Sequence, residues 1–238
     1  MVAQLLEDYL MAQNKSHAVM GQRTEKRASL DDFPTPPWAV RALLMHVLVP
    51  MVDCQPKHMV SEPACGRGDM SDALREYFGS TQATDIKDYG YAGMQRKADY
   101  RDMDTPFPIV DWTITNPPFN AAEAFITRAL MVSRKGVAIF IRSTFTESVG
   151  RYNRIFRDHP PNIVAQFSER VVLHKSKLSE KGSTATAYCW LVWETEPRVR
   201  RFSWHTKYVW IPPCRAELEK SSDYDRYRRK RLTRRKSR

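Results

Sequence analysis

The chain has 238 residues, of which 42% are hydrophobic and 27% charged, and these values exclude a fibrous or wholly disordered protein. No apolar run approaches the roughly 20 residues that a bilayer crossing needs, and acids and amides interrupt the first twenty residues, where a signal peptide would be apolar. The four cysteines are isolated, which argues against a disulfide framework and against a metal site. We therefore expect a soluble protein in a reducing cytoplasm.

The positive charge is concentrated at the C-terminal end. The net charge is +11, but residues 226–238 hold nine Lys and Arg residues and no acid, so the preceding chain carries only about +2. Such a dense basic run cannot pack in a core, and we expect it to be disordered on its own. Its expected role is sequence-independent contact with nucleic-acid phosphates. The residues predicted to make these contacts are Arg226, Arg228, Arg229, Lys230 and Arg231.

Three regions follow from the apolar pattern. Residues 1–30 are predicted to form a short amphipathic helix and a flexible arm, residues 31–196 a folded domain, and residues 197–238 a short C-terminal segment with the basic tail. A helix is expected to begin at Pro37 and to run through Leu48, because proline is favoured in the first turn.

Beyond residue 50 the chain alternates β-rich runs with amphipathic segments, which predicts an α/β fold with a mostly parallel sheet. Polar residues 174–183 join the last two predicted strands, which should form an antiparallel hairpin. The predicted strands are His58–Glu62, Ser80–Asp85, Trp112–Thr115, Val137–Ser143, Ile163–Leu173 and Thr184–Glu194, and the predicted helices between them are Asp69–Phe78, Ala121–Ser133 and Ser148–Asp158.

A glycine-containing loop lies between the first strand and the following helix, in the sequence SEPACGRGD. Gly66 and Gly68 allow a tight turn and a close approach of a ligand to the backbone. Glu62 ends the strand where it would repel a pyrophosphate, and Ser71 stands where a dinucleotide fingerprint has its third glycine. The loop therefore suits a cationic or hydroxyl-rich ligand, although a plain structural turn explains it equally well.

Asp85 ends the next strand, nineteen residues beyond Gly66. A carboxylate at this place can accept hydrogen bonds from both hydroxyls of a ribose. The alternative is an acid that only caps the strand, and the register with Gly66 favours the ribose.

The sequence Asn116-Pro117-Pro118-Phe119 follows an apolar strand directly. Two prolines fix the backbone, so the Asn116 carboxamide and the Pro117 carbonyl can be held toward one point. An exposed Phe119 beside this point would offer a stacking face. A rigid turn without chemistry is the alternative.

With these motifs the sequence resembles class I methyltransferases that use S-adenosylmethionine, and among them the small stand-alone phage and prophage enzymes that methylate the adenine amino group in DNA. Residues 33–38 resemble their N-terminal cofactor motif, residues 62–68 their glycine loop, residues 116–119 their catalytic loop, and Arg170-Val171 with residues 187–193 their final hairpin. The resemblance implies a Rossmann-like, mostly parallel seven-stranded sheet with helices on both faces, in a protein of the cytoplasm of a bacterium or a phage-infected host. The residues it implies for S-adenosylmethionine are Phe33, Thr35, Pro36, Glu62, Ala64, Gly66, Gly68, Asp85 and Asn116, with either Asp99 or Asp102 at the cofactor's adenine.

The resemblance also implies a mechanism. Both protons of the adenine amino group would be bound by the Asn116 side-chain oxygen and the Pro117 carbonyl, and the base, flipped out of the duplex, would stack on Phe119. Cys65 is then a packing residue without a catalytic role. Arg142, Lys175 and Lys177 are expected near the nucleic acid, and a chain that ends at Tyr224 is expected to bind the cofactor normally.

Four alternatives remain open on the sequence. The acceptor could be adenine in RNA, the N4 amine of cytosine in DNA, or a glutamine amide in a protein, because this loop serves planar amino groups in general. The chain could also be an inactive methyltransferase core that only binds nucleic acid. The basic tail favours nucleic acid over protein, and the short segment after Glu194 leaves no room for a full recognition domain, which predicts low sequence specificity.

Overall fold

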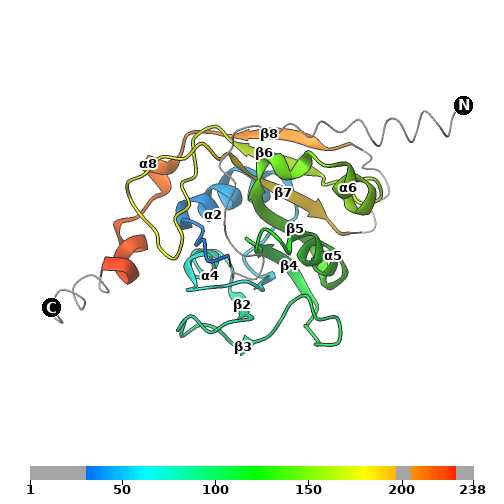
Figure 1. Cartoon of the computed structure of the whole chain (residues 1–238), viewed down its shortest axis with the longest axis horizontal. Coiled ribbons are helices and arrows are strands. Elements are labelled where there is room, and N and C mark those ends of the chain that lie inside the picture. Colours follow the sequence, from blue (N-terminus) through cyan, green and yellow to red (C-terminus); the bar gives the residue numbers. More distant parts are fainter. Residues whose placement is uncertain (1–30, 197–204, 229–238) are drawn as a thin grey trace, which may run out of the picture.

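The computed structural model describes residues 31–196 and 205–228, and within them one eight-stranded sheet forms the centre of the molecule (Figure 1). The strand order is β3-β2-β1-β4-β5-β7-β6-β8. Strands β1 to β5 pair in parallel, β7 runs antiparallel to both of its neighbours, and β8 is parallel to β6. The expected α/β architecture with a C-terminal antiparallel pair is therefore confirmed, but the sheet has eight strands where seven were expected, because β8 adds to the edge formed by β6. The predicted helix and arm of residues 1–30 lie outside the described residues.

All six predicted strands are present, and two more were missed. β7 begins at Tyr188 and not at Thr184. Tyr188 pairs with Arg142, the last residue of β5, so residues 184–187 have no strand residue of β5 to pair with. The edge strand β8 was missed because exposed Tyr208 and Trp210 obscure its apolar pattern. The strands are β1 (Met59–Glu62), β2 (Ser80–Asp85), β3 (Arg96–Lys97), β4 (Val110–Thr115), β5 (Ser133–Arg142), β6 (Ile163–Phe167), β7 (Tyr188–Glu194) and β8 (Lys207–Ile211).

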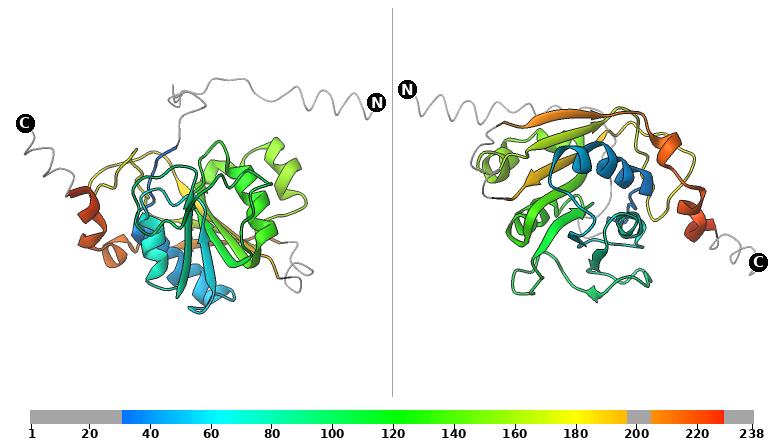
Figure 2. Two further views of the ribbon diagram at one scale, coloured as in Figure 1. Left: turned by 90° about the horizontal axis from the view of Figure 1, so that it is seen from below. Right: turned by 180° about the vertical axis from the view of Figure 1, so that it is seen from behind.

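Helices cover both faces of the sheet (Figure 2). The helix expected from Pro37 does begin there, but it is continued by a π-helical turn, and the helices expected over 69–78 and 148–158 are shorter or irregular. The helical segments are α2 (Pro37–Leu43), η1 (Leu44–Leu48), α3 (Val49–Met51), α4 (Asp69–Arg75), α5 (Ala122–Val132), η2 (Ser143–Thr146), α6 (Val149–Arg151), η3 (Tyr152–Phe156), α8 (Arg215–Leu218) and η4 (Ser221–Tyr224). No helix among them is long and apolar enough to cross a membrane.

Two apolar cores lie on opposite faces of the sheet, as side-chain alternation along β5 shows. Ala138 and Phe140 pack in the core under α2 and α4, whereas Val137, Ile139 and Ile141 pack in the core under α5 and η3. Trp190 and Trp193 of β7 are buried, as predicted, and are 0% and 3% exposed. Such two-sided burial is typical of a sheet with helices on both faces.

The parallel strands β1, β2 and β4 end at the same edge of the sheet. β1 ends at Glu62 before the glycine loop, β2 ends at Asp85, and β4 ends at Thr115 directly before Asn116. In open α/β sheets ligands bind outside the carboxyl ends of the strands. The fold therefore brings the three polar motifs together at the edge where a ligand is expected.

Candidate functional site

A cavity of about 290 Å³ opens at this edge. Six carboxylates but only two guanidinium groups line it, so its wall favours a cationic ligand or one rich in hydroxyl donors. The carboxylates are those of Asp31, Asp32, Glu62, Asp69, Asp85 and Asp99, and the guanidinium groups are those of Arg67 and Arg101.

Asp85 and the glycine loop are in direct contact. The Gly66 N–H donates a 2.8 Å hydrogen bond to Asp85 Oδ2, and the Lys87 N–H donates a 2.9 Å hydrogen bond to Oδ1. Each oxygen keeps a further lone pair for a ligand hydroxyl. Burial raises the pKa of Asp85, although the backbone N–H groups lower it in part. The predicted register between Gly66 and Asp85 thus corresponds to a hydrogen bond.

Gly66 and Gly68 both have left-handed backbones, with φ of +52° and +86°. A Cβ at Gly68 would lie 2.2 Å from the ring of Tyr91, which Asp72 holds through a 2.6 Å hydrogen bond, whereas a Cβ at Gly66 would meet nothing within 4 Å. We expect Gly68→Ala to lower the free energy of unfolding by about 2 to 4 kcal/mol, and Gly66→Ala by only about 1 kcal/mol. Chemical denaturation measures both, and equal losses would contradict the close approach of Tyr91.

Glu62 is buried at the base of the cavity. The residue is 2% exposed, and its carboxyl accepts a hydrogen bond from the Ser71 hydroxyl. Burial raises its pKa well above the ordinary value, and the negative charge of Asp85 raises it further. A ligand with positive charge would lower this pKa and stabilise the carboxylate.

The Asn116 carboxamide is held in one orientation. Its Nδ2 donates hydrogen bonds to the Phe33 carbonyl at 3.0 Å and to Thr35 Oγ1 at 2.9 Å. Since a backbone carbonyl only accepts, the contact with Phe33 fixes which amide atom is nitrogen. The hydrogen bonds of the described residues leave the Asn116 oxygen available as an acceptor beside the cavity.

The N-terminal segment joins the catalytic loop to the glycine loop. Asp31 Oδ2 accepts a 2.9 Å hydrogen bond from the Phe119 N–H, and Asp32 forms an ion pair with Arg67. The rings of Phe33 and Phe119 pack with centroids 5.8 Å apart. Residues 31–35 therefore fix the relative position of the two loops.

Phe119 is not exposed as the sequence predicted. It is half-buried, and the Arg142 guanidinium lies over its ring at 4.5 Å. The Arg142 Nε is buried and has no hydrogen-bond partner among the described residues. Phe119 is partly covered because its loop folds back against residues 31–33. No local sequence pattern predicts this contact.

The structure separates the two candidate acids that the sequence left open. Asp99 lines the cavity and pairs with Arg101 through a 2.7 Å contact. Asp102 lies outside the cavity lining and is exposed, with its carboxylate bound to the Thr105 hydroxyl and the Asp104 N–H. The position of Asp99 favours it over Asp102 as a ligand of the cavity.

Most of the predicted cofactor residues line the cavity. They are Phe33, Thr35, Glu62, Ala64, Gly66, Asp85, Asp99 and Asn116, with Pro118 of the catalytic loop. Pro36, Gly68, Pro117 and Phe119 stand next to lining residues but are not in the lining itself. The sequence analysis missed Asp31, Asp32, Asp69, Tyr89 and Asn120. Of these, Asp69 directly follows the glycine loop 62–68 and Asn120 directly follows the catalytic loop 116–119. Their place in the sequence could therefore have identified them.

The predicted nucleic-acid residues fall into two groups. Lys175 and Lys177 lie exposed in loop 168–187, whose Ser176 N–H donates a 2.7 Å hydrogen bond to the Asp32 carbonyl next to the cavity. The expectation that the tail is disordered from Arg226 onward is wrong for Arg226 and Arg228, because residues 225–228 form a helical turn that is held by acidic partners. Arg229, Lys230 and Arg231 lie outside the described residues.

The four cysteines are buried and unpaired. Burial raises the pKa of the Cys65 thiol, so it is not a ready nucleophile although it lines the cavity. Across residues 31–196 and 205–228, no three His, Cys, Asp or Glu side chains are grouped to hold a metal ion.

Solved structures with the same architecture are known. A Listeria monocytogenes protein described as a class I S-adenosylmethionine-dependent methyltransferase superposes with a TM-score of 0.55 at 11% identity, over 79% of this chain and 67% of that one. The chain has the fold of class I methyltransferases. No family model matches the sequence, and no curated protein sequence matches it.

Two further solved structures share this fold. A modification subunit assigned to a type I restriction enzyme of Vibrio vulnificus YJ016 gives a TM-score of 0.53 at 17% identity, over 98% of this chain. The match spans 57% of that subunit, so this chain corresponds to little more than half of its length. A Pyrococcus horikoshii protein described as an RNA methyltransferase gives 0.50 at 16% identity, over 75% of this chain and 93% of that one.

Proposed function

We propose that this protein transfers a methyl group from S-adenosylmethionine to the exocyclic amino group of adenine in DNA. The observation that carries the proposal is the Asn116 carboxamide, which Phe33 and Thr35 hold with its oxygen available beside a cavity rich in carboxylates. A fixed acceptor at this place is suited to bind an amino group that reacts with a ligand of the cavity.

The cavity fits S-adenosylmethionine in size and charge. Its volume lies at the lower end of the range of small-molecule sites. Asp85 would accept hydrogen bonds from the ribose hydroxyls, Asp99 would bind the adenine amino group, and buried Glu62 would face positive charge. When bound, the cofactor supplies an electrophilic methyl group on a sulfonium.

The catalytic loop would bind and orient the acceptor. The Asn116 oxygen and the Pro117 carbonyl would accept hydrogen bonds from the two amino protons, which localises the nitrogen lone pair. Arg142 now covers the ring on which a flipped-out base would stack, so we propose that Arg142 moves aside and contacts the base or a phosphate. Its unpartnered Nε supports such a role.

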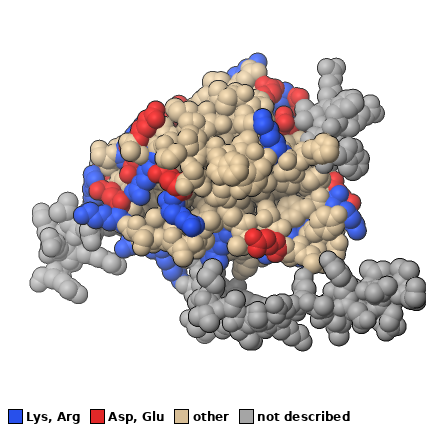
Figure 3. Space-filling model, turned by 90° about the horizontal axis from the view of Figure 1, so that it is seen from above, with Lys and Arg blue, Asp and Glu red and all other residues tan. Residues whose placement is uncertain are grey.

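DNA is the favoured polymer for three reasons. The net charge is strongly positive, the catalytic loop resembles that of DNA adenine enzymes, and the structural neighbours include a modification subunit assigned to a type I restriction enzyme. Figure 3 shows Lys and Arg side chains gathered on the side of α8, interleaved with acids. Lys175, Lys177, Arg229, Lys230 and Arg231 are the proposed phosphate contacts, because Arg226 and Arg228 are paired with acidic residues of the same chain.

We expect the affinity for S-adenosylmethionine to fall as the pH is lowered. Glu62 and Asp85 have raised pKa values, and burial raises the pKa of Asp69 to about 6. A cationic ligand and donating hydroxyls both favour the ionised carboxylates, so binding strengthens as the pH rises through these pKa values. Calorimetric titrations between about pH 5 and pH 8 measure the effect. Affinity that is constant over this range would contradict it.

The direct test supplies tritiated S-adenosylmethionine with duplex DNA, single-stranded DNA, RNA or protein in parallel. The proposal requires incorporation into DNA by the natural protein and at least about 100-fold less by Asn116→Ala. Incorporation only into RNA or only into protein would show that DNA is not the substrate. Cofactor binding without transfer to any polymer would show that the protein is an inactive methyltransferase core. We propose low sequence specificity, so sequencing of the product should show many methylated contexts.

A further inference from the structure

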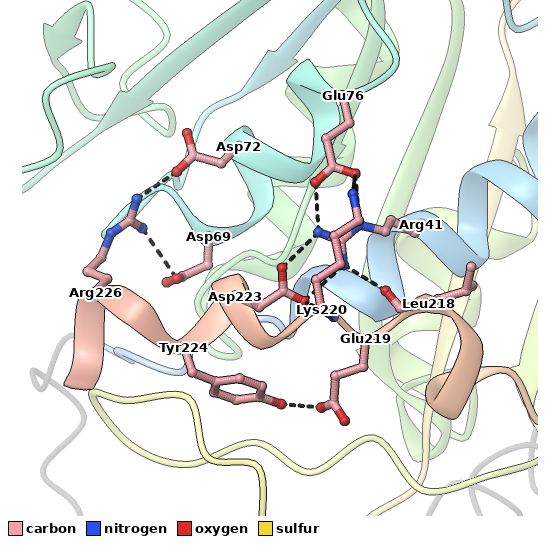
Figure 4. A network of polar contacts seen from close by, with 10 residues as sticks. All are labelled: Arg41, Asp69, Asp72, Glu76, Leu218, Glu219, Lys220, Asp223, Tyr224 and Arg226. Carbon is pink, nitrogen blue, oxygen red and sulfur yellow. Dashed lines mark hydrogen bonds and ion pairs between the residues drawn. The ribbon is translucent and has the colours of Figure 1, made fainter.

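The C-terminal segment 215–228, here called the strap, lies across α2 and α4. Arg41 of α2 anchors its first part, with hydrogen bonds to the Leu218 carbonyl at 2.7 Å and to Asp223 at 2.8 and 2.9 Å. The same guanidinium binds Glu76, which also pairs with Lys220 of the strap at 2.8 Å. Figure 4 shows how this network fixes the strap on the two helices.

The last turn of the strap reaches the glycine loop. The Tyr227 hydroxyl donates a 2.6 Å hydrogen bond to Asp69 Oδ2. Arg226 donates to the Arg67 carbonyl, lies 3.3 Å from Asp69 Oδ1 and pairs with Asp72 at 2.6 Å. Two adjacent strap residues therefore hold the loop at both sides of Gly68.

The residues that the strap holds also form the cavity wall. Arg67 and Asp69 line the cavity, and Asp69 is 5% exposed. The hydrogen bond from Tyr227 and the charge of Arg226 keep the pKa of Asp69 lower than burial alone would set it. Without them, a buried carboxylate at the start of α4 would lose its nearest donors, and the turn at Gly68 would lose its outer support.

We infer that Tyr227 and Arg226 are positioning residues that hold the Arg67–Asp69 turn in the shape that receives the cofactor. The strap is then part of the cofactor site, contrary to the expectation that a chain ending at Tyr224 binds the cofactor normally. The nature of the ligand rests on the proposed function, whereas the contacts of the strap do not.

Four full-length variants test the inference. Tyr227→Phe removes one hydroxyl and Arg226→Gln one guanidinium from the loop. Tyr152→Phe and Arg157→Gln make the same changes at exposed positions around η3 and serve as controls. Calorimetry measures the affinity for S-adenosylmethionine, steady-state kinetics give KM and kcat, and thermal unfolding reports stability.

We expect Tyr227→Phe and Arg226→Gln each to weaken cofactor binding about 10-fold and to raise its KM, with kcat at saturating cofactor within about twofold of the natural protein. The controls should bind normally. Natural affinity in both strap variants would overturn the inference, as would an equal loss in the controls or a loss of kcat without a change in KM. If the natural protein itself does not bind S-adenosylmethionine, the proposed function fails instead.

A pH profile separates positioning from a general loss of stability. Asp69 is faced by Tyr227 and Arg226 of the strap, Arg67 of the loop, Asp72 of α4 and Glu62 of β1. Removing the Tyr227 hydroxyl raises the pKa of Asp69, so the pH at which cofactor affinity is half-maximal should move upward in Tyr227→Phe and stay in place in Tyr152→Phe. An unshifted midpoint in Tyr227→Phe would contradict the contact.

Discussion

Replacing Asn116 with alanine is expected to lower kcat by at least about 100-fold while cofactor affinity changes little. The substitution removes the acceptor that Phe33 and Thr35 hold in place, and the loss of one preorganised contact to a reacting group has effects of this size. Single-turnover methylation of DNA at saturating cofactor measures the rate, and calorimetry measures the affinity.

Asn153→Ala is the matched control, because Asn153 is an exposed amide of η3 away from the cavity. It should keep the natural rate. A parallel loss of cofactor affinity in Asn116→Ala would show that the residue supports the structure of residues 33–35 and does not act on the acceptor.

Replacing Asp85 with alanine should produce the complementary result, a loss of cofactor affinity of about 100-fold or more. Two hydrogen bonds from hydroxyls to a buried carboxylate would be lost, each worth about 1.5 to 3 kcal/mol. The contact with the Gly66 N–H would be lost as well, which loosens the loop.

Asp88→Ala controls for charge and for a lost turn contact. Asp88 is exposed, and its carboxylate accepts a 2.6 Å hydrogen bond from the Gly90 N–H. Its cofactor affinity should stay within about threefold of the natural value, since an exposed charge contributes little. Unchanged affinity in Asp85→Ala would mean that this carboxylate does not bind the ribose.

The parts of the site that the sequence predicted are those set by strand ends. Apolar runs locate β1, β2 and β4. Parallel pairing of these strands is enough to bring Glu62, Asp85 and Asn116 to one edge of the sheet. The 19-residue spacing therefore predicts that Gly66 and Asp85 lie close together, and the structure shows a hydrogen bond between them.

The parts that the sequence did not predict depend on polar contacts between distant residues. Arg226 and Asp72 are 154 residues apart, and neither an ion pair nor a hydrogen bond leaves a periodic pattern. For the same reason the covering of Phe119 by Arg142 was not foreseen, and the choice of Asp99 over Asp102 needed the course of the loop after β3.

The identity of the methylated nucleoside decides whether this protein methylates the adenine amino group in DNA. DNA incubated with the protein and isotope-labelled S-adenosylmethionine is digested to nucleosides, and mass spectrometry separates N6-methyladenine from N4-methylcytosine. We expect labelled N6-methyladenine from the natural protein and almost none from Asn116→Ala. Labelled methylcytosine alone, or no labelled nucleoside from a protein that binds the cofactor, would contradict it.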